Sequence, residues 1–184
     1  MTIAVLISGR GGNLRAILES SVGELVSAVI SDNPKAAGLQ TALEHDKAAY
    51  SLSPADFDKH SDWENKLGEL LEAVQPRIIA LAGFMRILRA DWVSRFADRM
   101  VNIHPSLLPA FPGLNTHRRA LAAGVKEHGC TIYRVCEKVD GGEIIAQKKV
   151  PVLADDTPKT LAVRVSAAEH ALYPAVLAEL ISKV

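Results

Sequence analysis

The chain has 184 residues, of which 48% are hydrophobic and 23% are charged, as in an ordinary globular domain. Its 21 lysines and arginines balance 21 aspartates and glutamates, so the net charge gives no general attraction to nucleic acid or to a membrane surface. We therefore expect one domain over residues 1–184 and no nucleic acid or membrane among its partners.

Short apolar segments alternate with amphipathic ones along the first 104 residues. The apolar runs predict strands at residues 2–7, 26–31, 77–82 and 100–104, and the helical spacing of apolar side chains predicts helices at 13–19, 36–45, 62–74 and 91–96. Strands that alternate with helices pair in parallel. The fold class is therefore predicted to be α/β, with a doubly wound and mostly parallel sheet.

The pattern changes after residue 104. Three prolines and one glycine break up residues 105–113. We expect a helix at 116–123 and strands at 128–135 and 144–150 after this loop. The turn Asp140-Gly141-Gly142 separates these two strands, so we expect an antiparallel hairpin that closes one edge of the sheet. A last helix should begin at Thr157 with Pro158 in its first turn, and Pro174 should kink or restart it.

A glycine-rich turn, residues 8–13, joins the first strand to the first helix. Glycines let the backbone approach an anion closely, so Gly11, Gly12 and Asn13 are candidates for a phosphate site. Leu14 stands where a dinucleotide-binding turn has its third glycine, although Asp32 lies where that class has its ribose-binding acid. The alternative is a plain tight turn in which Asn13 caps the helix.

Three polar residues form a candidate catalytic group. Asn102 and His104 lie two apart at the carboxyl end of a predicted parallel strand, so they should face the same ligand crevice. An amide can donate to a developing oxyanion, and an imidazole can move a proton near neutral pH. Asp140 could orient the imidazole or accept a proton. The alternative is structural: Asn102 and His104 would bond the proline-rich loop, and Asp140 would begin a turn.

Other chemistries find little support in the sequence. The six histidines are scattered without a metal-binding spacing, so we expect no metal, and the nucleophile motif of serine hydrolases is missing. Cys130 and Cys136 are too few for a disulfide framework and are expected to be packing residues. The segment Ile3–Ile7 is too short for a secretion signal, and no apolar run approaches the roughly 20 residues of a membrane span. We expect a cytoplasmic protein.

Several segments together resemble one family, the folate-dependent formyltransferases of purine biosynthesis. The matching residues are 4–14 (AVLISGRGGNL), 81–88 (LAGFMRIL), 102–109 (NIHPSLLP), 111–113 (FPG), 116–117 (TH), 140–142 (DGG) and 169–174 (EHALYP). They run through nearly the whole chain in order. The resemblance also implies a Rossmann-like fold.

The resemblance implies a reaction between two small molecules. The amine of 5-phosphoribosylglycinamide attacks the formyl carbon of the cosubstrate 10-formyltetrahydrofolate, and the tetrahedral intermediate collapses to formylglycinamide ribonucleotide and tetrahydrofolate. By the same resemblance, Asn102 and His104 would stabilise the oxyanion. Asp140 would manage the proton and keep His104 positively charged.

The resemblance also implies two binding regions. Gly11, Gly12, Asn13, Gly83 and Glu169 would bind phosphoribosylglycinamide, with Glu169 on its ribose. Met85, Arg86, Ile87, Leu88, Asn102 and Val139 would bind the folate, with Arg86 available to its glutamate tail. By composition alone, Met85 and Ile87 would instead be expected in the core.

Three positions depart from the family pattern. Gly12 stands where a serine is common, Tyr133 where a histidine is frequent, and His60 where a basic residue is expected near the folate. These departures bear on substrate affinity more than on the type of reaction.

Three other functions compete with this reaction: two belong to other formyl-group enzymes, and one to a binding protein without catalytic activity. Methionyl-tRNA formyltransferase carries an RNA-binding domain, and formyltetrahydrofolate hydrolase an N-terminal regulatory domain, for which we find no counterpart here. A nucleotide-binding module without chemistry is favoured by Asp32 and disfavoured by Asn102, His104 and Asp140. The sequence leaves the oligomeric state open.

Overall fold

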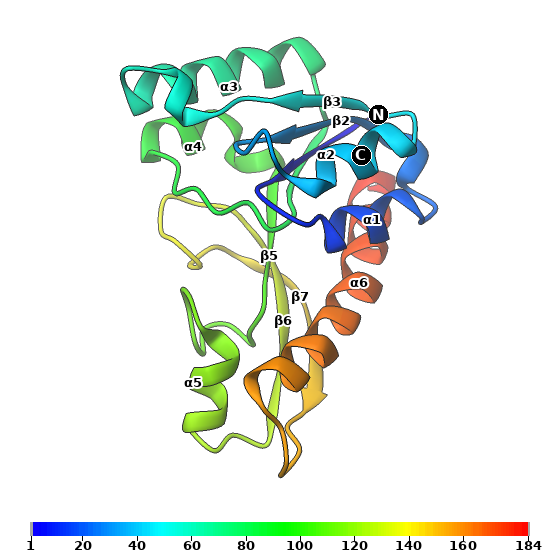
Figure 1. Cartoon of the computed structure of the whole chain (residues 1–184), viewed down its shortest axis with the longest axis vertical. Coiled ribbons are helices and arrows are strands. Elements are labelled where there is room, and N and C mark those ends of the chain that lie inside the picture. The colour runs from blue at the N-terminus through cyan, green and yellow to red at the C-terminus, as the bar shows by residue number, and fades with distance from the viewer. Residues whose placement is uncertain (1, 184) are drawn as a thin grey trace.

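The computed structural model describes residues 2–183, and within them seven strands form a single sheet (Figure 1). The strands are β1 (Ile3–Ile7), β2 (Val26–Ser31), β3 (Ala48–Ser51), β4 (Ile78–Leu81), β5 (Met100–His104), β6 (Glu127–Arg134) and β7 (Ile144–Pro151). The α-helices are α1 (Gly12–Leu18), α2 (Ala37–Glu44), α3 (His60–Val74), α4 (Ala90–Phe96), α5 (Thr116–Ala122) and α6 (Pro158–Ser182). Short 3₁₀ turns lie at Gly23–Leu25, Pro54–Asp56 and Ala97–Arg99.

The strand order is β3-β2-β1-β4-β5-β6-β7. The pairs from β3 to β5 are parallel, whereas β6 is antiparallel to β5 and β7 is antiparallel to β6. This arrangement confirms the predicted α/β class, the mostly parallel sheet and the antiparallel edge.

Alternate side chains of the central strand β1 enter two different cores. Ile3, Val5 and Ile7 pack in one cluster with apolar residues of α1 and α6, while Ala4 and Leu6 pack in a second cluster with α3 and α4. Figure 1 shows these two pairs of helices on opposite faces of the sheet. Because all five positions of β1 are buried, the strand is a continuous apolar run, as expected for a parallel sheet covered on both faces.

The last helix runs without a break through Pro174, so the predicted restart there was wrong. Tyr173, the residue before this proline, is completely buried, and its hydroxyl lies 3.0 Å from the carbonyl oxygen of Leu81 and 3.1 Å from that of Val101. Tertiary packing of α6 on the sheet therefore outweighs the one intrahelical hydrogen bond that a proline removes.

Strand β3 was not predicted. Its four residues, Ala48–Ser51, lie at the sheet edge, and three of them are exposed. A short edge strand carries little of the apolar signal by which buried strands are recognised.

The chain reverses direction across the sheet between β1 and β4. The connection from β1 leads through α1 to β2 on one side, whereas β4 lies on the other side of β1. In open α/β sheets ligands bind where the strand order reverses, outside the carboxyl ends of the strands. Gly11 lies just beyond β1 with φ of 78°, and a side chain there would meet Gly38 of α2 at 2.9 Å. The turn after β1 therefore needs glycine for both its conformation and its packing.

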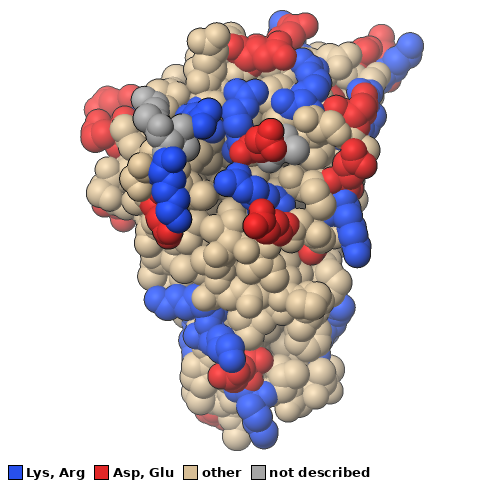
Figure 2. Space-filling view, turned by 180° about the vertical axis from the view of Figure 1, so that it is seen from behind, with Lys and Arg blue, Asp and Glu red and all other residues tan. Residues whose placement is uncertain are grey.

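The surface shows charges of both signs. On the face drawn in Figure 2, basic and acidic side chains lie beside one another over the upper part, with a broad uncharged area below them. Within residues 2–183, no helix has the length and apolar character that crossing a membrane would require.

Candidate active site

A cavity of about 460 Å³ lies at the carboxyl ends of β4 and β5. Nine of the predicted site residues line it: Gly83, Met85, Arg86, Ile87, Leu88, Asn102, His104, Val139 and Asp140. They come from three separate segments of the chain, so the fold brings together the predicted catalytic and folate-binding groups.

The three polar residues meet inside this cavity. Asn102 and His104 share one face of β5, and Asp140 approaches them from the segment between β6 and β7, with its Oδ1 3.5 Å from Nδ1 of His104. The side chains of His104 and Asp140 are each 8% exposed. Asp140 has φ of 52°, a left-handed conformation that aspartate adopts more readily than most residues.

The proline-rich loop after β5 holds two of these side chains. Nε2 of His104 lies 3.1 Å from the carbonyl oxygen of Phe111, and the backbone N–H of Gly113 donates to Oδ2 of Asp140 over 2.7 Å. The contact of His104 with the proline-rich loop that the structural alternative predicts is therefore present. It is also compatible with catalysis, because such contacts fix the groups in place.

Tyr133 is a site residue whose part the sequence did not reveal. Its hydroxyl lies between Asn102 and Asp140, 2.8 Å from Nδ2 of the first and 2.9 Å from Oδ1 of the second. The pKa of the Tyr133 phenol is raised well above its usual value, mainly because the phenol is buried. In the sequence, Tyr133 stood out only because a histidine is frequent at its position in the family, and its partners could not be predicted without the strand register.

The apolar cavity residues include two that were expected in the core by composition. Met85 is 67% exposed and Ile87 is 73% exposed, so that expectation was wrong. Val139, from the segment that carries Asp140, is 57% exposed on the same cavity. Large apolar side chains held open to solvent around a cavity are typical of a ligand site.

The remaining predicted residues, Gly11, Gly12, Asn13 and Glu169, gather where α1 meets α6. Nδ2 of Asn13 donates to Oε2 of Glu169 over 3.0 Å. Glu169 is 8% exposed, and burial raises the pKa of its carboxyl while the hydrogen bond from Asn13 opposes the shift. The helix begins after Gly11 without a side-chain cap, so the alternative in which Asn13 caps it was wrong.

Backbone contacts connect this region with the cavity. The N–H of Ser8, which follows β1, donates to the carbonyl oxygen of Gly83 over 3.2 Å. The N–H of Met85 donates in return to the Ser8 hydroxyl over 2.8 Å. The glycine-rich turn and the cavity loop therefore form one continuous surface at the reversal point of the sheet.

Asp32 and Arg86 form an ion pair that the sequence did not predict. The Asp32 side chain is 3% exposed and pairs with Nε of Arg86, beside a second cavity of about 440 Å³. An acid that is already bound to a guanidinium is poorly placed to recognise a ribose, which weakens the dinucleotide alternative.

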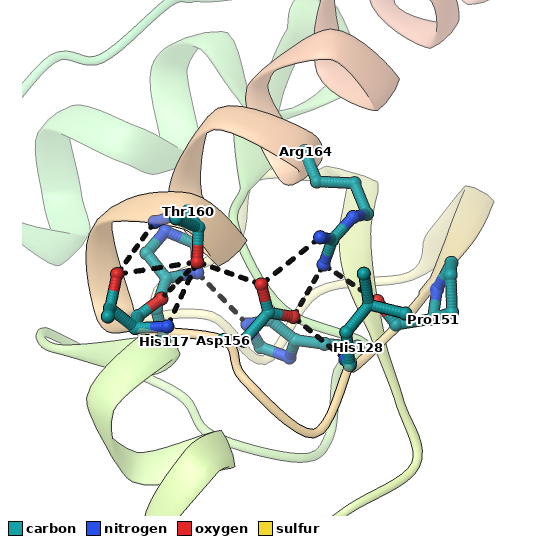
Figure 3. Close-up of polar contacts among 8 residues, drawn as sticks. His117, His128, Pro151, Asp156, Thr160 and Arg164 are labelled. Atoms are coloured by element: carbon teal, nitrogen blue, oxygen red, sulfur yellow. Dashed lines mark hydrogen bonds and ion pairs between the residues drawn. The ribbon is translucent and has the colours of Figure 1, made fainter.

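Two neighbouring histidines have lowered pKa values, and one of them, His117, lines the cavity. Figure 3 shows His117 of α5 beside His128 of β6, with 3.2 Å between Nδ1 and Nε2. Burial, followed by the neighbouring His117 and His104, lowers the pKa of His128 to about 4. Burial also lowers the pKa of His117.

In the part of the chain that the structure describes, no three His, Cys, Asp or Glu side chains are grouped so that they could hold a metal ion. Cys130 is fully buried, and burial raises the pKa of its thiol to about 12. This supports the prediction that Cys130 is a packing residue rather than a nucleophile.

The comparisons with known proteins agree with this geometry. The family model described as formyl transferase matches residues 1–177. Phosphoribosylglycinamide formyltransferase of Escherichia coli K12 is 43% identical over 181 residues, which cover 96% of this chain and 85% of that protein. The trifunctional purine biosynthetic protein adenosine-3 of Homo sapiens is 42% identical over 179 residues, which cover 95% of this chain and 18% of that longer protein.

Solved structures give the same result in three dimensions. The phosphoribosylglycinamide formyltransferase of Coxiella burnetii has a TM-score of 0.92 at 44% identity, covering 96% of this chain and 85% of that one. The phosphoribosylglycinamide formyltransferase of Bacillus halodurans has a TM-score of 0.93 at 37% identity, covering 100% of this chain and 96% of that one. These matches confirm the resemblance seen in the motifs, and the chain belongs to the formyl transferase family.

Proposed function

We propose that the chain is a single-domain enzyme of purine biosynthesis that moves a formyl group from 10-formyltetrahydrofolate to the amine of 5-phosphoribosylglycinamide. The products would be formylglycinamide ribonucleotide and tetrahydrofolate. One observation carries the proposal: Asn102, His104 and Asp140 converge in one cavity of a chain whose relatives of 43% and 44% identity bear this activity in their names. The expected cytoplasmic location stays a prediction.

The proposed reaction joins the amine nitrogen to the formyl carbon. The C=O bond becomes C–O⁻ in a tetrahedral intermediate, which an N–H of Asn102 and protonated His104 would stabilise. Asp140, 3.5 Å from His104, would orient that ring and accept a proton from the amine. The intermediate collapses when the bond from carbon to the folate nitrogen breaks and that nitrogen takes up a proton. Overall, one proton moves from the amine to the folate.

Phosphoribosylglycinamide would bind along the turn after β1. Backbone N–H groups of Gly11, Gly12 and Asn13 would hold its phosphate, because the turn is glycine-rich and lies at the start of a helix. Glu169, fixed by Asn13, would accept hydrogen bonds from ribose hydroxyls. Gly83 would let the substrate pass from this turn into the cavity, since it has φ of 76° and nothing within 4 Å of where a side chain would stand.

The folate would bind in the cavity of about 460 Å³. Met85, Ile87, Leu88 and Val139 would contact its flat pterin ring, which suits an apolar slot with a few polar groups. Asn102 would contact the formyl end. Arg86 would bind a carboxylate of the glutamate tail, and Asp32 would hold the guanidinium at the edge of the cavity.

The test is tetrahydrofolate release from 10-formyltetrahydrofolate by the purified protein, with and without 5-phosphoribosylglycinamide. We expect turnover only with the amine, and a loss of at least about 100-fold in Asp140→Asn, because proton transfer by a side chain contributes that much or more. The matched control is Asp58→Asn, which removes the same charge from an exposed position outside the cavity and should keep wild-type turnover.

Each other outcome has a definite meaning. Turnover without the amine would make the protein a formyltetrahydrofolate hydrolase. Absence of turnover in the folded protein, or full activity of Asp140→Asn, would refute the proposal.

A further inference from the structure

Tyr133 lies on β6, the strand next to the one that carries the predicted oxyanion donor Asn102. β6 is antiparallel to β5, and its register places Tyr133 directly opposite Asn102. Side chains of such a pair point to the same face of the sheet. Tyr133 is 4% exposed and lines the cavity, so its phenol reaches the site from a rigid strand rather than from a loop.

The direction of both hydrogen bonds follows from the groups involved. A carboxylate can only accept, so the single phenolic hydrogen of Tyr133 is donated to Oδ1 of Asp140 over 2.9 Å. The phenolic oxygen then accepts from Nδ2 of Asn102 over 2.8 Å. This contact fixes which end of the amide is nitrogen. It uses one of the two hydrogens on Nδ2 and leaves the other for an oxygen in the cavity.

The Tyr133 hydroxyl links Asn102 and Asp140, two groups that would otherwise be independent, and we call this link the Tyr133 bridge. Asp140 lies in the irregular segment between β6 and β7, where backbone positions are less constrained than in a strand. Its carboxylate is tied to the phenol, to His104 and to the N–H of Gly113. Because the raised pKa of Tyr133 keeps its proton in place, the phenol acts as a fixed donor and exchanges no proton with substrate.

We propose that Tyr133 is a positioning residue for formyl transfer, which holds the oxyanion donor Asn102 and the proton acceptor Asp140 at a fixed separation through its one hydroxyl. This inference rests on the proposed function. A positioning role affects the step in which charge develops, since Asn102 and Asp140 act on the transition state more than on bound substrate. Loss of the hydroxyl should therefore lower kcat and leave both KM values nearly unchanged.

The first test compares three tyrosine-to-phenylalanine variants. We expect Tyr133→Phe to lower kcat by about 10- to 100-fold, as misplaced catalytic groups do, with KM for each substrate within about threefold of wild type. Tyr173→Phe removes another buried hydroxyl, one that contacts only backbone oxygens, and Tyr50→Phe removes an exposed one from β3. Both controls should keep wild-type kcat. An unchanged kcat in Tyr133→Phe, or a loss confined to KM, would overturn the proposal.

A second measurement does not depend on turnover. In ¹⁵N-labelled wild-type protein, the side-chain amide protons of Asn102, assigned by their loss in Asn102→Ala, should include one that exchanges slowly with water. Two rapidly exchanging protons would refute the Tyr133 bridge. If wild-type protein releases no tetrahydrofolate while the slow proton is present, the proposed function fails and the bridge stands.

Discussion

The buried His128 should make folding stability depend on pH between 7 and 5. His128 is 1% exposed, and burial lowers the pKa of its imidazole to about 4. In an unfolded chain the pKa of a histidine is near 6.5. As the pH falls below 6.5, the unfolded chain takes up a proton that the folded chain does not take up until about pH 4. The free energy of unfolding must therefore fall. The linkage relation gives a loss of about 2 kcal/mol between pH 7 and pH 5 from this one group.

The assay is urea unfolding at pH 7, 6 and 5 for wild type and His128→Asn, which has a neutral side chain at every pH. Carboxyl groups contribute equally to both proteins, so the difference between them isolates His128. The stability of His128→Asn should fall by about 2 kcal/mol less than that of wild type. A second neutral replacement, His128→Gln, should show the same reduced pH dependence as His128→Asn. Equal slopes for wild type and His128→Asn would refute the reasoning.

Three further predictions concern the site and the last helix. Asn102→Ala should lower kcat by about 100- to 1,000-fold, the usual cost of one oxyanion donor, measured as tetrahydrofolate release. Arg86→Ala should raise KM for the formyl donor by about 10- to 100-fold, because it loses a charge-assisted hydrogen bond to the glutamate tail; an unchanged KM would show that the tail binds elsewhere. Thr157→Ala should cost about 1 kcal/mol, because it removes the capping box with Thr160, and should lower Tm by about 2–4 °C in a thermal melt. An unaltered Tm would show that the cap is not needed.

An ion pair between Asp156 and Arg164 lies beside the Thr157 cap at the start of α6. The Arg164 guanidinium holds the pKa of the Asp156 carboxyl well below its usual range, and Asp156 also accepts from the N–H of Leu153. Helix α6 is therefore anchored by charged and capping contacts at its beginning and by packing further along. Thr157→Ala tests the cap alone.

Buried, local patterns were predictable from the sequence. Strands β1, β2 and β5 and the long helix α3 each bury a regular apolar face, and their observed bounds agree with the prediction to within two residues. The positions of Asn102 and His104 on one face of β5 follow from the two-residue period of a strand. Asp140 was also a candidate before the resemblance was considered, as an orienter of the imidazole or a proton acceptor, but its distance from His104 could not be predicted because its segment has no regular spacing.

Contacts between distant segments were not predictable. The Asp32–Arg86 pair joins residues 54 apart, and the bridge through Tyr133 requires the register between β5 and β6. Register is set by packing of the whole sheet, and a predicted strand alone does not specify its partner. For the same reason the sequence placed Asn13 and Glu169 in one binding region through the resemblance but did not reveal that they touch.

The hydrogen bond between Asn13 and Glu169 has a consequence for synthesis of the protein. It joins residues 156 apart, the first near the start of α1 and the second in α6. The residues of β1 to β5 have all been made once synthesis reaches residue 104, but one face of these strands is completed only by α6, whose Leu161 and Val165 belong to the same core as Val5. The proposed ribose site likewise waits for α6 to dock against α1. A chain released before α6 has been made therefore lacks both this part of the core and Glu169, the side chain that we propose for holding the ribose.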